Sequence, residues 1–172
     1  MSQTKNEHDA VEVNRLLAGA AKAIGSVRYC WLATVAEPGG HLRPMGRLPN
    51  DEGDDEWMIR FLTDGRSSKA SDMRRDNRVT IVFQNDPDDA FVSLIGTATP
   101  RESASWVRAH WKEAYDVYFP SELDRANAIF IDVAVQRMEL WIRGVTPEPF
   151  GLQKTVLERN AEGGWRAPGA GA

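Results

Sequence analysis

The order of its strand-like segments constrains the fold of this chain more than any other sequence feature. About seven segments are apolar or alternate apolar with polar side chains, and helical segments fall between only some of them. This order lacks the regular strand–helix–strand alternation that predicts a doubly wound parallel sheet. It predicts a mainly β protein, a mostly antiparallel barrel with flanking helices on its outside.

Turn residues separate the strand-like segments. The first two, at 29–36 and 41–48, flank the turn Glu37-Pro-Gly-Gly. Pro44 cannot donate a backbone N–H to a ladder, so the second segment is predicted to have a free edge or a bulge. The other strand-like segments are 57–63, 77–84, 91–98, 129–135 and 138–143.

Length and composition exclude several classes of protein. The 172 residues suit a single domain, and the net charge of −4 argues against broad binding to nucleic acids or anionic membranes. Cys30 is the only cysteine, which excludes an intrachain disulfide, and the three histidines make a Cys/His metal cluster implausible. The sequence has neither a membrane-spanning apolar run nor a signal-peptide core, so we expect a cytoplasmic protein with no membrane or nucleic-acid partner.

The two ends of the chain differ from its middle. We expect a disordered arm over residues 1–8, one folded domain over 9–150, and a polar, disordered tail over 151–172. Asp9 is predicted to cap the first helix, because Glu12 follows it in capping-box spacing. Gly25 is predicted to end that helix.

The most informative segment is FLTDGRSSK at 61–69, where a strand ends, a tight turn follows, and a helix begins. A helix N-terminus exposes unpaired N–H groups and the positive end of the helix dipole. Hydroxyls and cations placed there predict a phosphate site. The residues of this type are Arg66, Ser67, Ser68 and Lys69. The alternative is a serine that only caps the helix, beside two solvated surface cations.

In its order of elements and in this segment, the chain resembles the flavin-binding split barrels related to pyridoxamine 5'-phosphate oxidase. Within them it most resembles the bacterial general stress protein subgroup. The sharpest element is Thr63-Asp64-x-x-Ser67-x-Lys69, followed by a short helix and a strand that begins at Asn77. The resemblance, which covers about 11–143, implies a split β-barrel of the FMN-binding type. It further implies a homodimer whose two cofactor sites are each built from both chains.

The resemblance also implies roles for individual residues. Arg66, Ser67, Ser68 and Lys69 stand where relatives hold the FMN phosphate, although Ser68 replaces an Arg of the fuller oxidases. Backbone groups of a preceding strand face the flavin ring, and the chain of the second strand passes the flavin. Phe61, Leu62 and Thr63 match the strand whose backbone groups face the ring, and the alternative for them is ordinary barrel packing. Arg43, Pro44 and Met45 match the second strand, and the alternative for them is a plain edge strand.

Two further residues match cofactor-binding positions of relatives. Gln84 is similar to a polar residue that reaches ribityl or phosphate, and its alternative is a strand end facing water. Trp141 is similar to an aromatic that reaches across the dimer toward the ring, and its alternative is barrel core. Trp106 and His110, four residues apart on a predicted helix, are interpreted as packing and receive no catalytic role.

No nucleophilic, paired-carboxylate or metal-ligand constellation is readable, so the catalytic residues stay unknown and no metal is predicted. This fits a protein whose cofactor carries the chemistry. The main hypothesis is an FMN-dependent oxidoreductase that passes electrons from a nicotinamide donor to a small acceptor, with turnover itself left open. The alternatives are a non-catalytic flavin-binding stress protein, a deazaflavin-dependent reductase, and a barrel that has lost its cofactor. True pyridoxamine 5'-phosphate oxidation is not expected, because the final Arg- and Pro-containing strand of those oxidases is missing.

Overall fold

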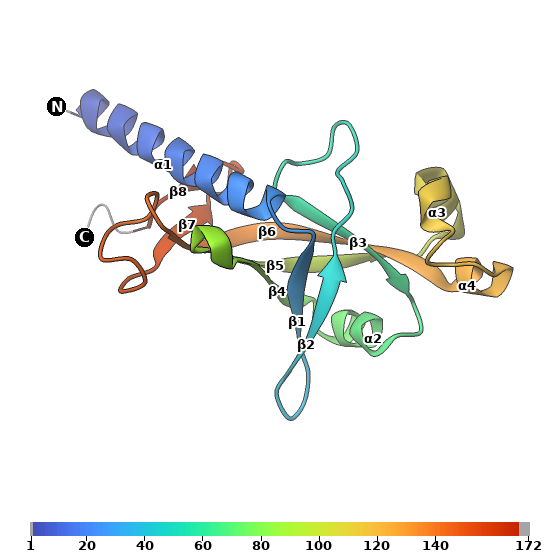
Figure 1. Cartoon of the computed structure of the whole chain (residues 1–172). Coiled ribbons are helices and arrows are strands. Elements are labelled where there is room, and N and C mark those ends of the chain that lie inside the picture. The colour runs from blue at the N-terminus through green and yellow to red at the C-terminus, as the bar shows by residue number, and fades with distance from the viewer. Residues whose placement is uncertain (1, 169–172) are drawn as a thin grey trace. The chain divides into compact units, whose positions relative to one another are not determined.

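More residues lie in strands than in helices in the computed structural model, which describes residues 2–168 (Figure 1). The strands are β1 (Tyr29–Val35), β2 (Gly40–Gly46), β3 (Met58–Asp64), β4 (Arg78–Asn85), β5 (Ala90–Arg101), β6 (Ala128–Ile142), β7 (Thr155–Arg159) and β8 (Trp165–Arg166). The helices are α1 (Ser2–Gly25), α2 (Ser68–Arg75), α3 (Ala104–His110), α4 (Glu122–Asn127) and the 3-10 turns η1 (Asp86–Asp88) and η2 (Glu113–Tyr115). The predicted fold class, mainly β with flanking helices, is confirmed.

The strands follow the order β2-β1-β4-β5-β6-β7-β8, and β3 pairs with β6 beside this path. The pairings of β6 with β3 and with β7 are antiparallel. Among the described strands β2 has β1 as its only neighbour, so Pro44 does lie on an edge strand. The path from β2 to β8 does not close on itself.

The chain divides into two compact units. The first unit takes in Met1–Trp31, Thr80–Ile95 and Gln136–Ala172, as far as these are described. The second unit takes in Leu32–Val79 and Gly96–Val135. Ten of the twelve predicted site residues belong to the second unit.

The core of the second unit lies on the β3–β6 pair, in which Phe61 is opposite Ile131 and both side chains are fully buried. Phe130 packs with Val107 of α3 and Tyr115 of η2. Gly96 is required where β5 approaches β6, because a Cβ there would lie 2.1 Å from the carbonyl oxygen of Ala134.

A buried ion network fixes the acidic loop at 50–56 onto this core. The Arg60 side chain, 5% exposed, donates to Asp132 at 2.7 Å, Asp51 at 2.9 Å and Asp54 at 3.0 Å. Arg101 binds the other oxygen of Asp132 at 2.9 Å. Breaking such a buried pair leaves an uncompensated charge, so the network is a structural element of this unit.

Trp106 and His110 of α3 serve packing, as predicted. Their rings stack with centroids 3.6 Å apart, and the Nδ1 of His110 lies 2.8 Å from the carbonyl oxygen of Trp106. The Trp106 ring also meets the edge of Phe130 and lies under the Arg60 guanidinium. Its faces are therefore engaged within the unit.

The predictions for the two chain ends, which fall in the first unit, were wrong where the structure describes them. The helix expected to begin after Asp9 begins at Ser2, because 2–8 holds residues compatible with a helix and no Gly or Pro. Thr155–Arg159 pairs with β6 instead of forming a structureless tail, and Leu157 is fully buried there. Its polar residues pair with charges on neighbouring segments, such as Glu158 with Arg137. Met1 and 169–172, also covered by those predictions, lie outside the described residues.

The two strands predicted at 129–135 and 138–143 are one strand, β6. Gln136 and Arg137 interrupt the apolar pattern, but neither is a Gly or a Pro that would end a strand. Within residues 2–168, no helix combines the length and apolar character needed to cross a membrane.

Candidate functional site

The candidate site begins at the loop that connects β3 to α2. Ser67 is the N-cap of α2, with extended backbone angles, and its hydroxyl oxygen accepts from the Ala70 N–H at 3.4 Å. Ser67 therefore caps α2. A helix leaves its first-turn N–H groups without intrahelical partners, and in α2 these include Ser68 and Lys69. Capping and anion binding use different N–H groups, so the cap still leaves donors available.

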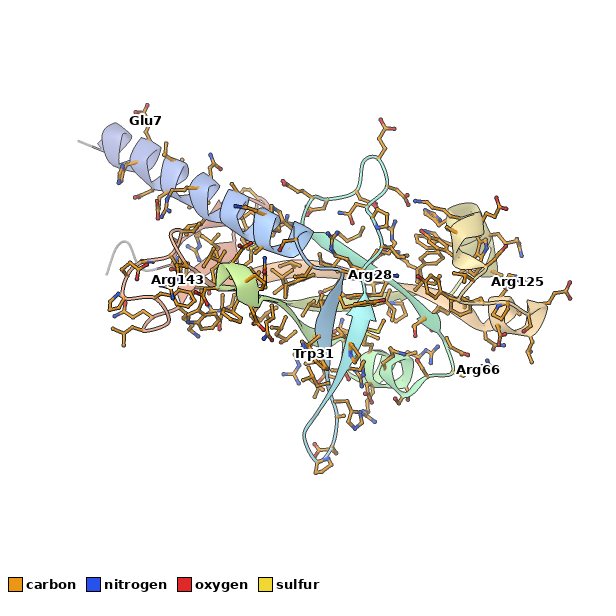
Figure 2. All side chains as sticks on the ribbon, viewed as in Figure 1. Glu7, Arg28, Trp31, Arg66, Arg125 and Arg143 are labelled. Carbon is orange, nitrogen blue, oxygen red and sulfur yellow. The ribbon has the colours of Figure 1, made fainter. Side chains whose placement is uncertain are left out.

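Arg66 lies on the loop between β3 and α2 (Figure 2), and its charge is already engaged. The guanidinium forms a two-pronged ion pair with Asp64, with Nη2 2.5 Å from Oδ2 and Nε 3.0 Å from Oδ1. The backbone N–H of Arg66 also donates to that carboxylate at 2.7 Å. These side-chain and backbone hydrogen bonds lower the pKa of Asp64 to about 2. The two opposite charges thus largely cancel.

Lys69 is the uncompensated cation of the site, and the charge of Arg43 acts on it. The pKa of Lys69 lies below its ordinary value because the side chain is half-buried and because the positive charge of Arg43 is close; Asp64 opposes this effect. Within residues 2–168, Lys69 has no carboxylate at ion-pairing distance. A half-buried lysine without an ion pair, with a second positive charge acting on it, is typical of an anion-binding site.

Asp72, a buried carboxylate of α2, holds Arg43 in place. Its Oδ2 accepts from Thr34 at 2.8 Å, from His41 at 2.9 Å and from Arg43 at 3.4 Å, and its Oδ1 accepts from Arg75 at 3.2 Å. Arg43 also donates to the Thr34 hydroxyl at 2.7 Å. Burial alone would raise the pKa of Asp72, but the hydrogen bonds from His41 and Thr34 and the charge of Arg43 outweigh it and lower that pKa.

The open edge of β3 presents one of the three predicted backbone groups. The Leu48 N–H donates to the Arg60 carbonyl at 2.8 Å on the side away from β6. Hydrogen bonding alternates along an antiparallel strand, so Leu62 also directs its N–H and C=O away from β6, where no described strand pairs with it. Phe61 and Thr63 face β6 with their backbone groups. The side chains of Phe61 and Leu62 pack in the core.

The other predicted residues fall in two groups. Pro44 is exposed and Met45 half-buried on β2, in the same unit as Arg43 and Lys69. Gln84 and Trp141 belong to the first unit. Gln84 is exposed and donates to Asp86 at 2.7 Å, and Trp141 is half-buried in β6.

Thr34, His41 and Asp72 were missed by sequence reasoning. Two local signals existed: Thr34 is polar on the buried side of an otherwise apolar strand, and Asp72 follows Lys69 by three residues on a helix. Both signals indicate a polar partner. They do not identify it, because Arg43 and Asp72 are 29 residues apart in the chain.

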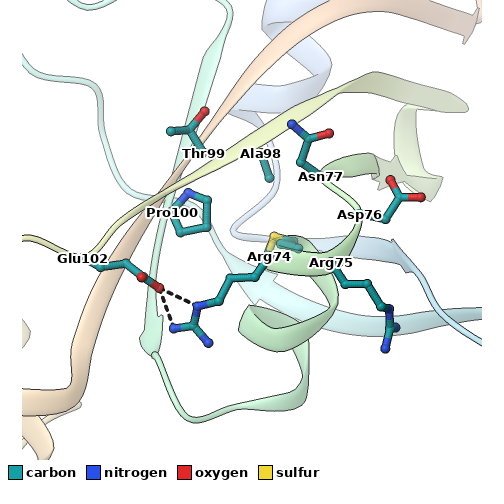
Figure 3. A pocket seen from close by; sticks show the side chains of 9 residues that line it. Arg74, Arg75, Asp76, Asn77, Ala98, Thr99, Pro100 and Glu102 are labelled. Atoms are coloured by element: carbon teal, nitrogen blue, oxygen red, sulfur yellow. Dashed lines mark hydrogen bonds and ion pairs between the residues drawn. The ribbon is translucent and has the colours of Figure 1, made fainter.

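The C-terminal end of α2 borders an open groove of about 570 Å³ (Figure 3). Arg74 points to Glu102 across it, with Nη2 2.5 Å from the carboxylate. Arg75 is paired with Asp72, as described above, and Asp76 is paired with Arg78 at 2.5 Å. The charges that line this groove are therefore compensated.

Comparisons with known proteins agree with this fold. The sequence profile of the family described as "Pyridoxamine 5'-phosphate oxidase like" matches residues 18–156. The sequence has no significant match among curated proteins.

Three solved structures illustrate the likeness. A protein related to general stress protein 26 from Clostridium acetobutylicum has a TM-score of 0.66 at 15% identity, covering 83% of this chain and 93% of that one. A pyridoxamine 5'-phosphate oxidase-related, FMN binding protein from Nostoc punctiforme has a TM-score of 0.60 at 19% identity, covering 91% of each chain. PhzG from Burkholderia lata, in complex with tetrahydrophenazine-1-carboxylic acid, has a TM-score of 0.59 at 13% identity, covering 86% of this chain and 85% of that one.

The family profile covers most of the sequence, and the structural neighbours share the fold over most of their own lengths. The chain belongs to the pyridoxamine 5'-phosphate oxidase like family.

Proposed function

We propose that this protein binds FMN, with the phosphate held by Arg43, Lys69 and the first-turn N–H groups of α2. The observation that supports this most is that Thr34 and Asp72 hold the guanidinium of Arg43 beside α2, whose first turn carries Lys69, and that the charge of Arg43 acts on Lys69. Two like charges in a half-buried setting repel each other. A phosphate monoester, which carries between one and two negative charges at neutral pH, relieves that repulsion and accepts several charge-assisted hydrogen bonds.

The remaining site residues fit a flavin as well as a phosphate. The backbone N–H of Leu62 lies on an open strand edge, so it can donate to a polar edge of a planar ring. When bound, FMN supplies the capacity to accept and release electrons, which no constellation of side chains described above provides. The chain's own part is to hold the phosphate, orient the ring and keep donors fixed beside it.

The activity proposed for the FMN-bound protein is electron transfer from a nicotinamide donor to a small acceptor. The FMN binding neighbour from Nostoc punctiforme supports a flavin as the cofactor, and the complex of PhzG with tetrahydrophenazine-1-carboxylic acid supports a small molecule as the second ligand. The second candidate is a flavin-binding stress protein without turnover, and the neighbour related to general stress protein 26 supports the stress-protein part of it. NADH and NADPH oxidation with and without protein, at equal FMN concentration, distinguishes the two. Faster oxidation with the protein supports the enzyme, and equal rates support the second candidate.

We also propose a homodimer in which the sites lie at the interface. The edge strand β2 and its neighbour β1 carry exposed apolar side chains, among them Leu42 at 61% and Val35 at 41% exposure. Exposed apolar groups beside a free strand edge favour burial against another chain. Gel filtration at micromolar concentration is expected to give a dimer, and a monomer would contradict the shared-site proposal.

FMN binding itself is tested by the visible absorbance of the purified protein before and after FMN addition and desalting. We expect a retained flavin spectrum and a saturable titration with one FMN per chain. A colourless protein that retains no added FMN would contradict the proposal. Deazaflavin is the next ligand to test in that case, because its phosphate offers the same chemistry to Arg43 and Lys69.

A further inference from the structure

We infer that Asp72 and Thr34 are positioning residues, which set the guanidinium of Arg43 for the phosphate through a hydrogen-bonded relay. This inference rests on the proposed function, because it concerns the same site. It goes beyond that function by assigning roles to two residues that would not themselves touch the ligand.

The relay is continuous in the structure. Arg43 donates through Nη1 to the Thr34 hydroxyl oxygen at 2.7 Å, and Thr34 donates its proton to Asp72 Oδ2 at 2.8 Å. The second guanidinium nitrogen of Arg43 lies 3.4 Å from the same Oδ2. The guanidinium of Arg43 is thus held at two of its nitrogens, one by Thr34 and one by Asp72.

The relay leaves most of the guanidinium available. An arginine has five N–H donors in a rigid fork, and Thr34 and Asp72 engage two of them. The other three remain for an anion. A long arginine on an edge strand would otherwise lose much rotamer freedom on binding, so prior fixation reduces that cost.

Because Asp72 lies in α2, both Lys69 and Arg43 are positioned by this one helix. Asp72 follows Lys69 by three residues in α2, so it lies on a neighbouring part of the same helix surface. The helix therefore carries Lys69 directly and holds Arg43 through Asp72, which fixes the spacing of the two charges.

Asp72 does not cancel the positive charge of Arg43. Its Oδ1 is paired with Arg75 and its Oδ2 also accepts from His41. The carboxylate is shared among several donors, while Lys69 has no carboxylate partner among the described residues. The cluster consequently keeps a surplus of positive charge on its Lys69 side.

The test uses a matched pair of substitutions at Thr34, read out by equilibrium binding of FMN and of riboflavin, which lacks the phosphate. Thr34→Val keeps the shape of the side chain and removes the hydroxyl, whereas Thr34→Ser keeps the hydroxyl. We expect T34V to weaken FMN binding about tenfold, the size of one lost hydrogen bond to a charged group, and to leave riboflavin binding unchanged. T34S is expected to stay within about threefold of the wild type.

A double-mutant cycle with Arg43→Ala identifies the route. R43A should weaken FMN binding by itself, and adding T34V to it should cost nothing further, because the relay acts only through Arg43. If T34V does not fold, Asp72→Asn and Arg43→Lys provide the same test. D72N weakens the acceptor at the end of the relay, and R43K keeps the charge but removes the fork.

The outcomes separate the inference from the proposed function. Equal FMN affinity in T34V and wild type, while R43A and Lys69→Ala weaken it, would overturn the relay and leave FMN binding intact. Equal loss of FMN and riboflavin in T34V would also overturn it, because a merely structural tie between β2 and α2 would not distinguish the two ligands. FMN binding that is unaffected by both R43A and Lys69→Ala would overturn the phosphate site itself.

Discussion

The two ends of α2 carry similar residues and differ in how their charges are paired. Each end is flanked by an aspartate that binds the arginine two residues later, Asp64 with Arg66 and Asp76 with Arg78. In both pairs Nη2 lies 2.5 Å from Oδ2, the arginine N–H donates to the carboxylate, and side-chain hydrogen bonding lowers the aspartate pKa to about 2. The flanking pairs therefore do not distinguish the ends.

The remaining cations do distinguish them. At the C-terminal end Arg74 is paired with Glu102 and Arg75 with Asp72. At the N-terminal end Lys69 lies near Arg43 and has no carboxylate partner within residues 2–168. The helix dipole adds to this difference, because its positive end is at the N-terminus. The presence of an unpaired cation, and not the number of cations, therefore marks the anion site.

The largest expected effect comes from removing the unpaired lysine. Lys69→Ala should weaken FMN binding by about 1.5–3 kcal/mol, the value of a charge-assisted hydrogen bond, while riboflavin binding stays unchanged. Arg74→Ala is the matched control at the paired end and should leave FMN affinity as it is. Isothermal titration calorimetry checks both. An equal loss of FMN affinity in the two variants would contradict the proposed difference between the two ends of α2.

The pH dependence of FMN affinity gives the next largest effect. Burial and the nearby charge of Arg43 place the pKa of Lys69 below 10.5, and a bound phosphate raises it again. At a pH above the pKa of Lys69 in the free protein, FMN binding must therefore be accompanied by uptake of a proton. FMN affinity should fall in that range, at a lower pH than the one at which a solvated lysine loses its charge. Lys69→Arg stays charged and corrects for titration of the flavin. A profile identical in both proteins would show that Lys69 does not contact the phosphate.

Removing the cap of α2 should have a moderate effect. Ser67→Ala is expected to cost about 1 kcal/mol of unfolding free energy and to weaken FMN a few-fold, because the first-turn N–H groups become less ordered. Ser103→Ala, at the N-cap of α3, is the control and should lower stability without changing FMN affinity. Chemical denaturation and FMN titration measure the two quantities. Unchanged FMN affinity in S67A would exclude the first-turn N–H groups from the site.

The smallest expected effect is a gain of FMN affinity when a carboxylate is removed. Asp64→Asn keeps an acceptor for the Arg66 N–H but removes the charge that engages the guanidinium. We expect FMN affinity to rise about two- to fivefold, the range of a partly exposed charge interaction. Asp76→Asn makes the same change at the other end and should have no effect. A rise in both variants would indicate a general response to net charge and no specific site.

Part of this arrangement could be predicted from the sequence. Local signals identified β3, the turn after it and the start of α2, because turn residues and a capping serine act within a few positions. The β7 strand was missed because its charged residues pair with residues elsewhere, such as Glu158 with Arg137. Likewise, the contact of Asp72 with Thr34 joins residues 38 apart. Such pairings are decided by tertiary contacts, which no short window reports.

The site shows the same division. The sequence singled out Arg66 and Lys69 equally, but only the structure separates them, since Asp64 engages one and leaves the other with Arg43. The identity of the electron donor and acceptor depends on pocket shape, which sequence motifs do not encode.

The most direct test of the central claim is the ratio of the dissociation constants of riboflavin and FMN for the wild-type protein at neutral pH and fixed salt. If Arg43 and Lys69 hold the phosphate, FMN should bind at least about tenfold more tightly than riboflavin. Equal affinities would mean that the phosphate contributes nothing, and would contradict the assignment of this pair as the anion site.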